Sequence, residues 1–155
     1  SLTSSEMIDL YVGLLEKHPA IRSIEDGLAE DDWESWSQFC KRAGDKCLIV
    51  GDDLTVTNTD RVSRAVESGA INALLVKPNQ AGTLSQAVEA IKTARAGGCE
   101  IVVSHRGGGE TNDTFIVDLA IASDAAYIKC GITRGERVAK YNYLMKAAAD
   151  LGMTS

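Results

Sequence analysis

The sequence predicts an α/β fold in which one helix is followed by five strand–helix units around a parallel sheet. Three observations support this prediction. Short apolar runs alternate with longer segments whose apolar residues recur at the helical period. Glycine follows several of those longer segments, where helices commonly end. Strands that alternate with helices in this way form parallel sheets joined by right-handed crossovers.

The helices are recognised by their capping residues and by apolar residues that recur along one face. In the first, Thr3 and Glu6 have capping-box spacing, and Pro19 ends the helix. Gly44 and Gly69 end the next two. The predicted helices span 3–18, 31–43, 58–68, 83–96, 112–122 and 135–151. The residues predicted to face the core are Met7, Leu10, Tyr11, Leu14 and Leu15; Trp33, Trp36 and Cys40; Val62, Ala65 and Val66; Leu84, Ala87, Val88 and Ile91; and Val138, Tyr141, Leu144, Met145 and Ala148.

The strands are short apolar runs between these helices. Their length and their content of Ile, Val and Leu are typical of strands buried on both faces of a parallel sheet. The predicted strands span 21–24, 47–50, 73–76, 100–103 and 126–128. No linker or low-complexity segment interrupts the pattern, so residues 1–155 are predicted to form a single domain.

Composition excludes several classes of protein. The net charge of −6 argues against binding to nucleic acid or an anionic membrane through bulk electrostatics. No apolar run reaches the length of a membrane span, and no signal-peptide pattern is present. The four cysteines lack metal-finger or CxxC spacing, which favours free thiols in a reducing compartment. We therefore expect a cytoplasmic protein.

An ionisable residue follows each predicted strand. These residues are Glu25, Asp52, Lys77, His105 and Lys129, and successive members lie between 24 and 28 residues apart. Parallel strands place their carboxyl ends at one edge, which is where barrels of this kind carry their active sites. One such residue alone is usually a helix cap or a solvated loop residue, but five together predict a shared site.

The residue types suggest distinct roles. Glu25 and Asp52 carry hard oxygen ligands suited to Mg²⁺. A neighbouring positive charge or a metal ion favours the neutral amine of a lysine, the form that accepts a proton. The cations of His105 and Arg106 predict an anionic substrate with carboxylate and phosphate groups, and a glycine such as Gly107 would let the backbone approach that ligand closely. Asp26 and Asp53, which follow the two predicted ligands, are interpreted as supporting or solvated residues.

Five motifs resemble the C-terminal part of the enolase family, the phosphopyruvate hydratases of glycolysis. They are SIEDGLAEDDWESW, GDDLTVTNTDR, ALLVKPNQAGTLSQAVEAI, VVSHRGGGETNDTFIVDLA and IKCGITRGERVAKYN, and they cover essentially the whole chain. The glycine of IEDG is similar to the bacterial branch. The resemblance implies a partial (β/α)8 TIM-type barrel, an enolase-like C-terminal domain, and the reversible dehydration of 2-phosphoglycerate to phosphoenolpyruvate.

The resemblance also implies roles for single residues. Glu25 and Asp52 would be the Mg²⁺ ligands. Lys77 would be the base that removes the proton next to the substrate carboxylate, and Lys129 would hold that carboxylate. His105 and Arg106 would contact the substrate, with Arg106 on the phosphate. Gly107 stands where the family has a serine that contacts the phosphate.

Three departures from the family pattern change what we expect of this chain. Only the last five barrel strands are recognised, so the third Mg²⁺ ligand and the residues that handle the leaving hydroxyl are expected elsewhere. The SHRGGGET segment has one residue more than the family pattern. The IKCGITRGER segment has one residue fewer, and Cys130 replaces threonine in it. We expect the chain alone to be inactive.

Five strands of an open barrel leave two edges without partners, and such edges pair with other chains. We therefore expect a homo-oligomer or a complementing N-terminal chain. Two alternatives to the lyase stay open: a non-catalytic enolase-like protein used for binding or assembly, and an enolase-superfamily lyase with a different carboxylate substrate.

Overall fold

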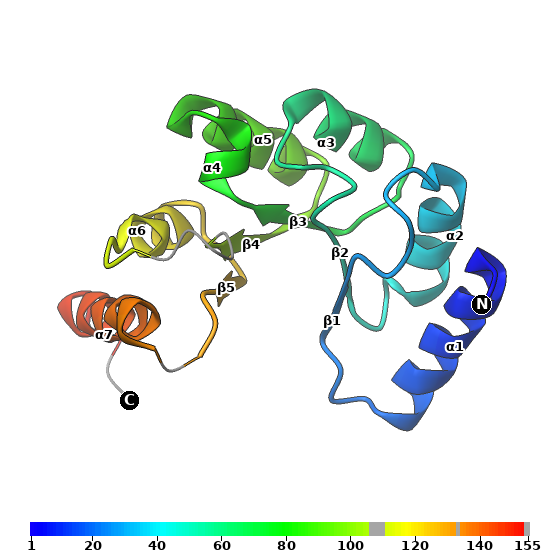
Figure 1. Ribbon diagram of the computed structural model, residues 1–155, viewed down its shortest axis with the longest axis horizontal. Helices are drawn as coiled ribbons and strands as arrows, with labels where there is room; N and C mark the ends of the chain where they lie inside the picture. Colours follow the sequence, from blue (N-terminus) through cyan, green and yellow to red (C-terminus); the bar gives the residue numbers. More distant parts are fainter. Residues whose placement is uncertain (106–110, 133, 154–155) are drawn as a thin grey trace. The chain divides into compact units, whose positions relative to one another are not determined.

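The computed structural model describes residues 1–105, 111–132 and 134–153. It divides into two compact units, Ser1–Ile101 and Val102–Ser155, and each is described by itself (Figure 1). Helices and strands alternate along the chain as predicted. The strands are β1 (Ser23–Glu25), β2 (Leu48–Gly51), β3 (Ala73–Val76), β4 (Glu100–Ser104) and β5 (Tyr127–Lys129). The helices are α1 (Ser4–Lys17), α2 (Trp33–Ala43), α3 (Thr59–Glu67), α4 (Pro78–Ala81), α5 (Leu84–Ala96), α6 (Phe115–Ala122) and α7 (Gly135–Asp150).

The sheet follows the order of the chain, β1-β2-β3-β4-β5. In the first unit β1 pairs in parallel with β2, which places Glu25 opposite Val50. Strand β2 pairs in parallel with β3, which places Val50 opposite Ala73. In the second unit β4 pairs in parallel with β5. Parallel pairing carries the ends of neighbouring strands to the same edge of the sheet, as the sequence predicted.

The core of the first unit lies between its strands and helices. All four residues of β3 are buried, as expected for a central strand covered on both faces. Trp36 and Phe39 of α2 are fully buried, and Phe39 stacks on Tyr11 of α1 with ring centroids 5.2 Å apart. Helix α3 packs against α5. Gly97 allows this packing, because a Cβ atom there would lie 2.2 Å from Cγ1 of Val66.

Several residues predicted to face the core do not. Leu10 is 46% exposed, Leu84 is 49% exposed, and Met145 is 63% exposed. Val138 of α7 is also exposed. Trp33 is half-buried and lies under the guanidinium of Arg64, 4.1 Å from the ring centroid. A helical stripe predicts burial only where a neighbouring element covers it, and in the second unit α7 packs against its neighbour α6.

Helix α4 was not predicted from the sequence. It is a single turn of four residues that begins with Pro78, and Lys77 is its N-cap. A segment this short carries no helical period, so only the favoured place of proline in a first turn could have indicated it. Among the described residues, no helix has the length and apolar character needed to cross a membrane.

Candidate metal and base site

Three carboxylates meet at the ends of β1 and β2. Glu25 is the last residue of β1, Asp26 follows it, and Asp52 directly follows β2. Each offers one oxygen, and these oxygens lie within 4.8 Å of one another. The parallel pairing of β1 with β2 accounts for this meeting, since both strands end at the same edge. The structure thus brings together the two predicted Mg²⁺ ligands and adds Asp26 to them.

Asp26 holds the turn that follows β2. Its Oδ1 accepts the backbone N–H of Asp52 at 3.0 Å, and its Oδ2 accepts that of Asp53 at 3.1 Å. Its own backbone lies in the left-handed region, with φ of 46°, where a non-glycine residue is uncommon. Burial raises the pKa of the Asp26 carboxyl, while the two backbone N–H groups act in the opposite direction. Asp26 is therefore a supporting residue that fixes Asp52.

The geometry of Asp52 suits a bound cation. The residue is 6% exposed, and its Oδ2 accepts a hydrogen bond from Nζ of Lys77 in a close ion pair. Its Oδ1 is buried and has no hydrogen-bond partner among the described residues. A buried carboxylate oxygen without a partner is costly. Because the Asp52 carboxylate also belongs to a cluster of hard oxygen ligands, the residues present fit Mg²⁺.

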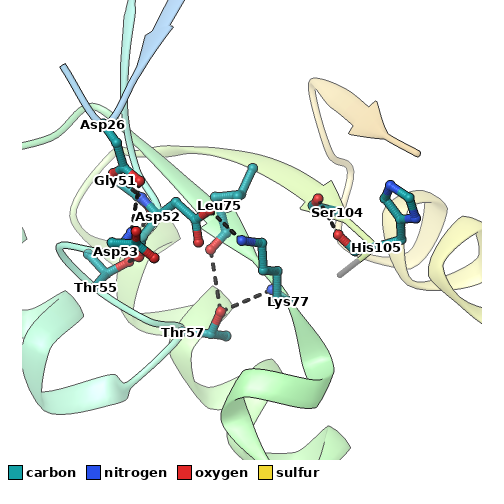
Figure 2. A network of polar contacts seen from close by, with 10 residues as sticks. All are labelled: Asp26, Gly51, Asp52, Asp53, Thr55, Thr57, Leu75, Lys77, Ser104 and His105. Atoms are coloured by element: carbon teal, nitrogen blue, oxygen red, sulfur yellow. Dashed lines mark hydrogen bonds and ion pairs between the residues drawn. The ribbon is translucent and has the colours of Figure 1, made fainter. Parts of the chain in front are cut away.

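Lys77 follows β3 and points toward Asp52, as Figure 2 shows. Its side chain is 16% exposed. Its backbone N–H donates to Oγ1 of Thr57 at 3.0 Å. The lysine is therefore held at both ends, by Thr57 at its backbone and by Asp52 at its amine.

The remaining predicted site residues belong to the second unit. The backbone N–H of His105 donates to the carbonyl oxygen of Lys129 at 3.1 Å, next to the register pair of Ser104 with Lys129. The structure thus brings the backbones of His105 and Lys129 together at the end of β4 and β5. The side chain of Lys129 is exposed, and His105 is half-buried. The predicted substrate contacts Arg106 and Gly107 lie outside the described residues.

Sequence reasoning left the role of Asp26 open and missed Thr57. The position of Asp26 directly after a strand was a signal, but nothing in the sequence distinguished a residue that clamps a turn from a solvated one. Thr57 gave no signal. Its φ is 53° and that of Val56 is 45°, and β-branched residues are the least expected in that region.

Comparison with known proteins gives a family match over the whole chain. The family model described as "Enolase, C-terminal TIM barrel domain" matches residues 1–155. A curated protein named "Enolase" from Natranaerobius thermophilus is 51% identical over 152 residues, which is 97% of this chain. The chain spans 35% of the length of that relative. These matches confirm the predicted resemblance and the predicted fold class, an α/β chain that forms part of a TIM barrel.

Proposed function

Because this chain belongs to the enolase C-terminal TIM barrel family, we propose that it carries part of the active site of a Mg²⁺-dependent lyase. The proposed reaction is the interconversion of 2-phosphoglycerate and phosphoenolpyruvate, a step of glycolysis in the cytoplasm. The observation that carries the proposal is the arrangement at Asp52. This buried carboxylate belongs to a cluster with Glu25 and Asp26. Its Oδ1 has no hydrogen-bond partner among the described residues, and its Oδ2 binds Lys77.

In this proposal Glu25 and Asp52 hold Mg²⁺, and Asp26 supports them. Bound Mg²⁺ supplies positive charge that stabilises the negative charge developing on the substrate carboxylate when the neighbouring proton is lost. Asp26 keeps the turn after β2 in place through two backbone hydrogen bonds, so that Asp52 need not reorganise when it binds a cation.

Lys77 is the proposed base. Its Nζ takes the proton from the carbon next to the substrate carboxylate, and the electron pair left on that carbon then expels the hydroxyl group from the adjacent carbon. The hydroxyl group leaves as water with a proton from the residues that handle the leaving group, which are expected elsewhere. An amine accepts a proton through the lone pair of its neutral form, and in the structure the amine of Lys77 contacts Asp52. Lys77 exchanges this contact for the substrate when it acts.

Four residues of the second unit are proposed to bind the substrate. Lys129 holds the carboxylate and His105 contacts the substrate, while Arg106 and the backbone of Gly107 bind the phosphate. The pairing of β4 with β5 supports this proposal for His105 and Lys129, because it places their backbones side by side.

The first experiment measures phosphoenolpyruvate formation with Mg²⁺. The chain is assayed alone and after mixing with the part of the Natranaerobius enolase that it does not cover. We expect turnover only in the mixture, and Lys77→Met should reduce it by about 10²–10⁴-fold, the contribution typical of a general base. Lys92→Met, at an exposed position of α5, is the matched control. Robust turnover by the chain alone would show that it is complete, and full turnover with Lys77→Met would show that Lys77 is not the base.

Calorimetry with Mg²⁺ tests the metal site separately. We expect Asp52→Asn to weaken binding more than Asp53→Asn, because the side chain of Asp53 lies outside the carboxylate cluster. Two further outcomes identify the alternatives. Binding that does not depend on Asp52 or Lys77 would favour a non-catalytic binding or assembly protein. Turnover of another carboxylate in a substrate panel, without turnover of 2-phosphoglycerate, would favour a different lyase of the superfamily.

Assembly is also a proposal. The chain is expected to form a homo-oligomer or to pair with an N-terminal chain, since both routes cover exposed strand edges. Light scattering of the chain alone and of the mixture distinguishes the two routes.

A further inference from the structure

We propose that Thr57 is a positioning residue, which sets the place of Lys77 relative to Asp52. This inference rests on the proposed function of Lys77 as the base. Thr57 is 1% exposed, and its hydroxyl makes two hydrogen bonds at the end of β3. It accepts from the backbone N–H of Lys77 at 3.0 Å and donates to the carbonyl oxygen of Leu75 at 3.4 Å. The hydroxyl thus stands between the last strand residues and the lysine that follows them (Figure 2).

The turn that carries Thr57 begins at the other member of the ion pair. The carbonyl oxygen of Asp52 accepts the backbone N–H of Thr55 at 3.1 Å and that of Val56 at 2.7 Å. The hydroxyl of Thr55 donates to the carbonyl oxygen of Gly51 at 3.1 Å and so ties the same turn to the end of β2. Asp52 and Thr57 are therefore the two ends of one short, internally bonded turn.

These contacts close a ring. The ring runs from Asp52 through the turn to Thr57, from the Thr57 hydroxyl to the backbone of Lys77, and along the Lys77 side chain back to the Asp52 carboxylate. Removing the hydroxyl opens the ring at the backbone of Lys77 while the ion pair stays. The position of Nζ would then depend on one contact in place of two.

The backbone of the turn supports this interpretation. Val56 and Thr57 both have left-handed backbone conformations, with φ of 45° and 53°. Two consecutive β-branched residues in this region are unfavourable, and such strain persists where the surrounding structure enforces it. Thr57 combines this left-handed backbone with a buried hydroxyl that accepts the backbone N–H of Lys77.

Three variants separate positioning from folding. Thr57→Val removes the hydroxyl and keeps the shape of the side chain, whereas Thr57→Ser keeps the hydroxyl. Thr57→Gly removes the hydroxyl and also removes the left-handed penalty, which offsets part of the stability lost with a buried side chain. Circular dichroism and thermal unfolding of each variant check that the chain is folded.

The first readout is the acylation rate of Lys77 on the chain itself, measured at one pH by peptide mass spectrometry with Lys92 as internal reference. We expect Thr57→Val and Thr57→Gly to raise the rate by about 2–10-fold, the factor that corresponds to one hydrogen bond. Thr57→Ser should stay near the wild-type rate. Unchanged acylation of Lys77 in both the valine and the glycine variants would overturn the proposal.

The second readout is turnover in the mixture described above. We expect Thr57→Val and Thr57→Gly to lower kcat by about 2–10-fold with little change in KM, because the reacting group and not the substrate contacts is displaced. Thr57→Ser should restore kcat. If the acylation rate changes but turnover does not depend on Lys77, only the proposed function is contradicted. If turnover depends on Lys77 but kcat is the same with and without the Thr57 hydroxyl, the positioning role is contradicted.

Discussion

The two units each contain a lysine that is largely withdrawn from solvent, and the two lysines have opposite surroundings. In the first unit Lys77 faces the carboxylate of Asp52. In the second unit Lys140 is 4% exposed, and its Nζ donates to the backbone carbonyl oxygens of Thr111 at 2.7 Å and Glu136 at 2.9 Å. A lysine that faces a carboxylate can exchange partners with a charged ligand. A lysine that bonds two fixed carbonyl groups instead joins two parts of the backbone, here the segment before α6 and the first turn of α7.

The units also differ in how their strands and helices are secured. Strand β3 is buried along its whole length, whereas Ile128 is only half-buried and lies between exposed residues of β5. In the first unit α1, α2, α3 and α5 each have an N-cap side chain that accepts a backbone hydrogen bond. The N-cap residues of α6 and α7 make no such bond. We infer that the first unit has the larger free energy of unfolding.

The largest expected effect tests this inference directly. Leu74 of β3 is fully buried, so Leu74→Ala should cost about 2–5 kcal/mol of unfolding free energy. Ile128→Ala should cost about 1–1.5 kcal/mol, since a half-buried side chain contributes roughly half the value of a buried one. Hydrogen exchange in denaturant, followed on peptides of β3 and β5, measures both losses. Equal losses in the two strands would contradict the difference between the units.

The next effect concerns the buried lysine of the second unit. Lys140→Met should cost about 1–3 kcal/mol, because two backbone carbonyl groups lose a charged donor. Exchange of the amides between Thr111 and Ala122 should accelerate most, since that segment loses its bond to α7. Lys146→Met, at an exposed position of the same helix, is the control and should change stability by less than about 0.5 kcal/mol. An unchanged exchange rate near Thr111 would mean that Lys140 does not hold the segment.

Part of the fold and of the candidate site could be predicted from the sequence. Strand and helix bounds followed within a few residues from apolar period and from caps such as Thr3, whose predicted capping box is present. The order of the strand ends along the chain was also enough to predict that Glu25 lies next to Asp52, because parallel pairing places the ends of neighbouring strands together. Local pattern and repeat length carry this information, so no contact has to be known in advance.

Other features depend on contacts that local pattern does not encode. The exposure of Val138 and Met145 depends on which elements cover α7, and a helical stripe does not specify its cover. The hydroxyl of Thr57 is hydrogen-bonded to residues 18 and 20 positions later in the chain. The roles of Lys129 and Arg106 stay predictions for a related reason: a substrate site gathers residues from several strands, and sequence spacing alone indicates only that they share an edge.

The smallest expected effect is a pH dependence of the first unit at the N-terminus of α2. Asp32 caps this helix: its Oδ1 accepts the backbone N–H of Ser35 at 3.2 Å, and its Oδ2 accepts the hydroxyl of Ser4 at 2.5 Å. The hydrogen bond from Ser4, followed by that from Ser35, lowers the pKa of the Asp32 carboxyl below its ordinary value of 3.8. A lowered pKa in the folded state means that the ionised carboxylate adds stability at pH values above 3.8. That stability is lost as the pH falls through the lowered pKa.

Asp32→Asn isolates this charge, because asparagine is also a good N-cap. The difference in unfolding free energy between wild type and variant should be under about 1 kcal/mol, as solvent screens an accessible carboxylate. It should be constant above pH 3.8 and vanish in stronger acid, which urea unfolding at a series of pH values measures. Asp31→Asn, at the exposed neighbouring position, controls for net charge. A difference in unfolding free energy that persists in strong acid would show that the effect comes from packing of the Asp32 side chain. The charge of this cap would then not contribute to the greater stability of the first unit.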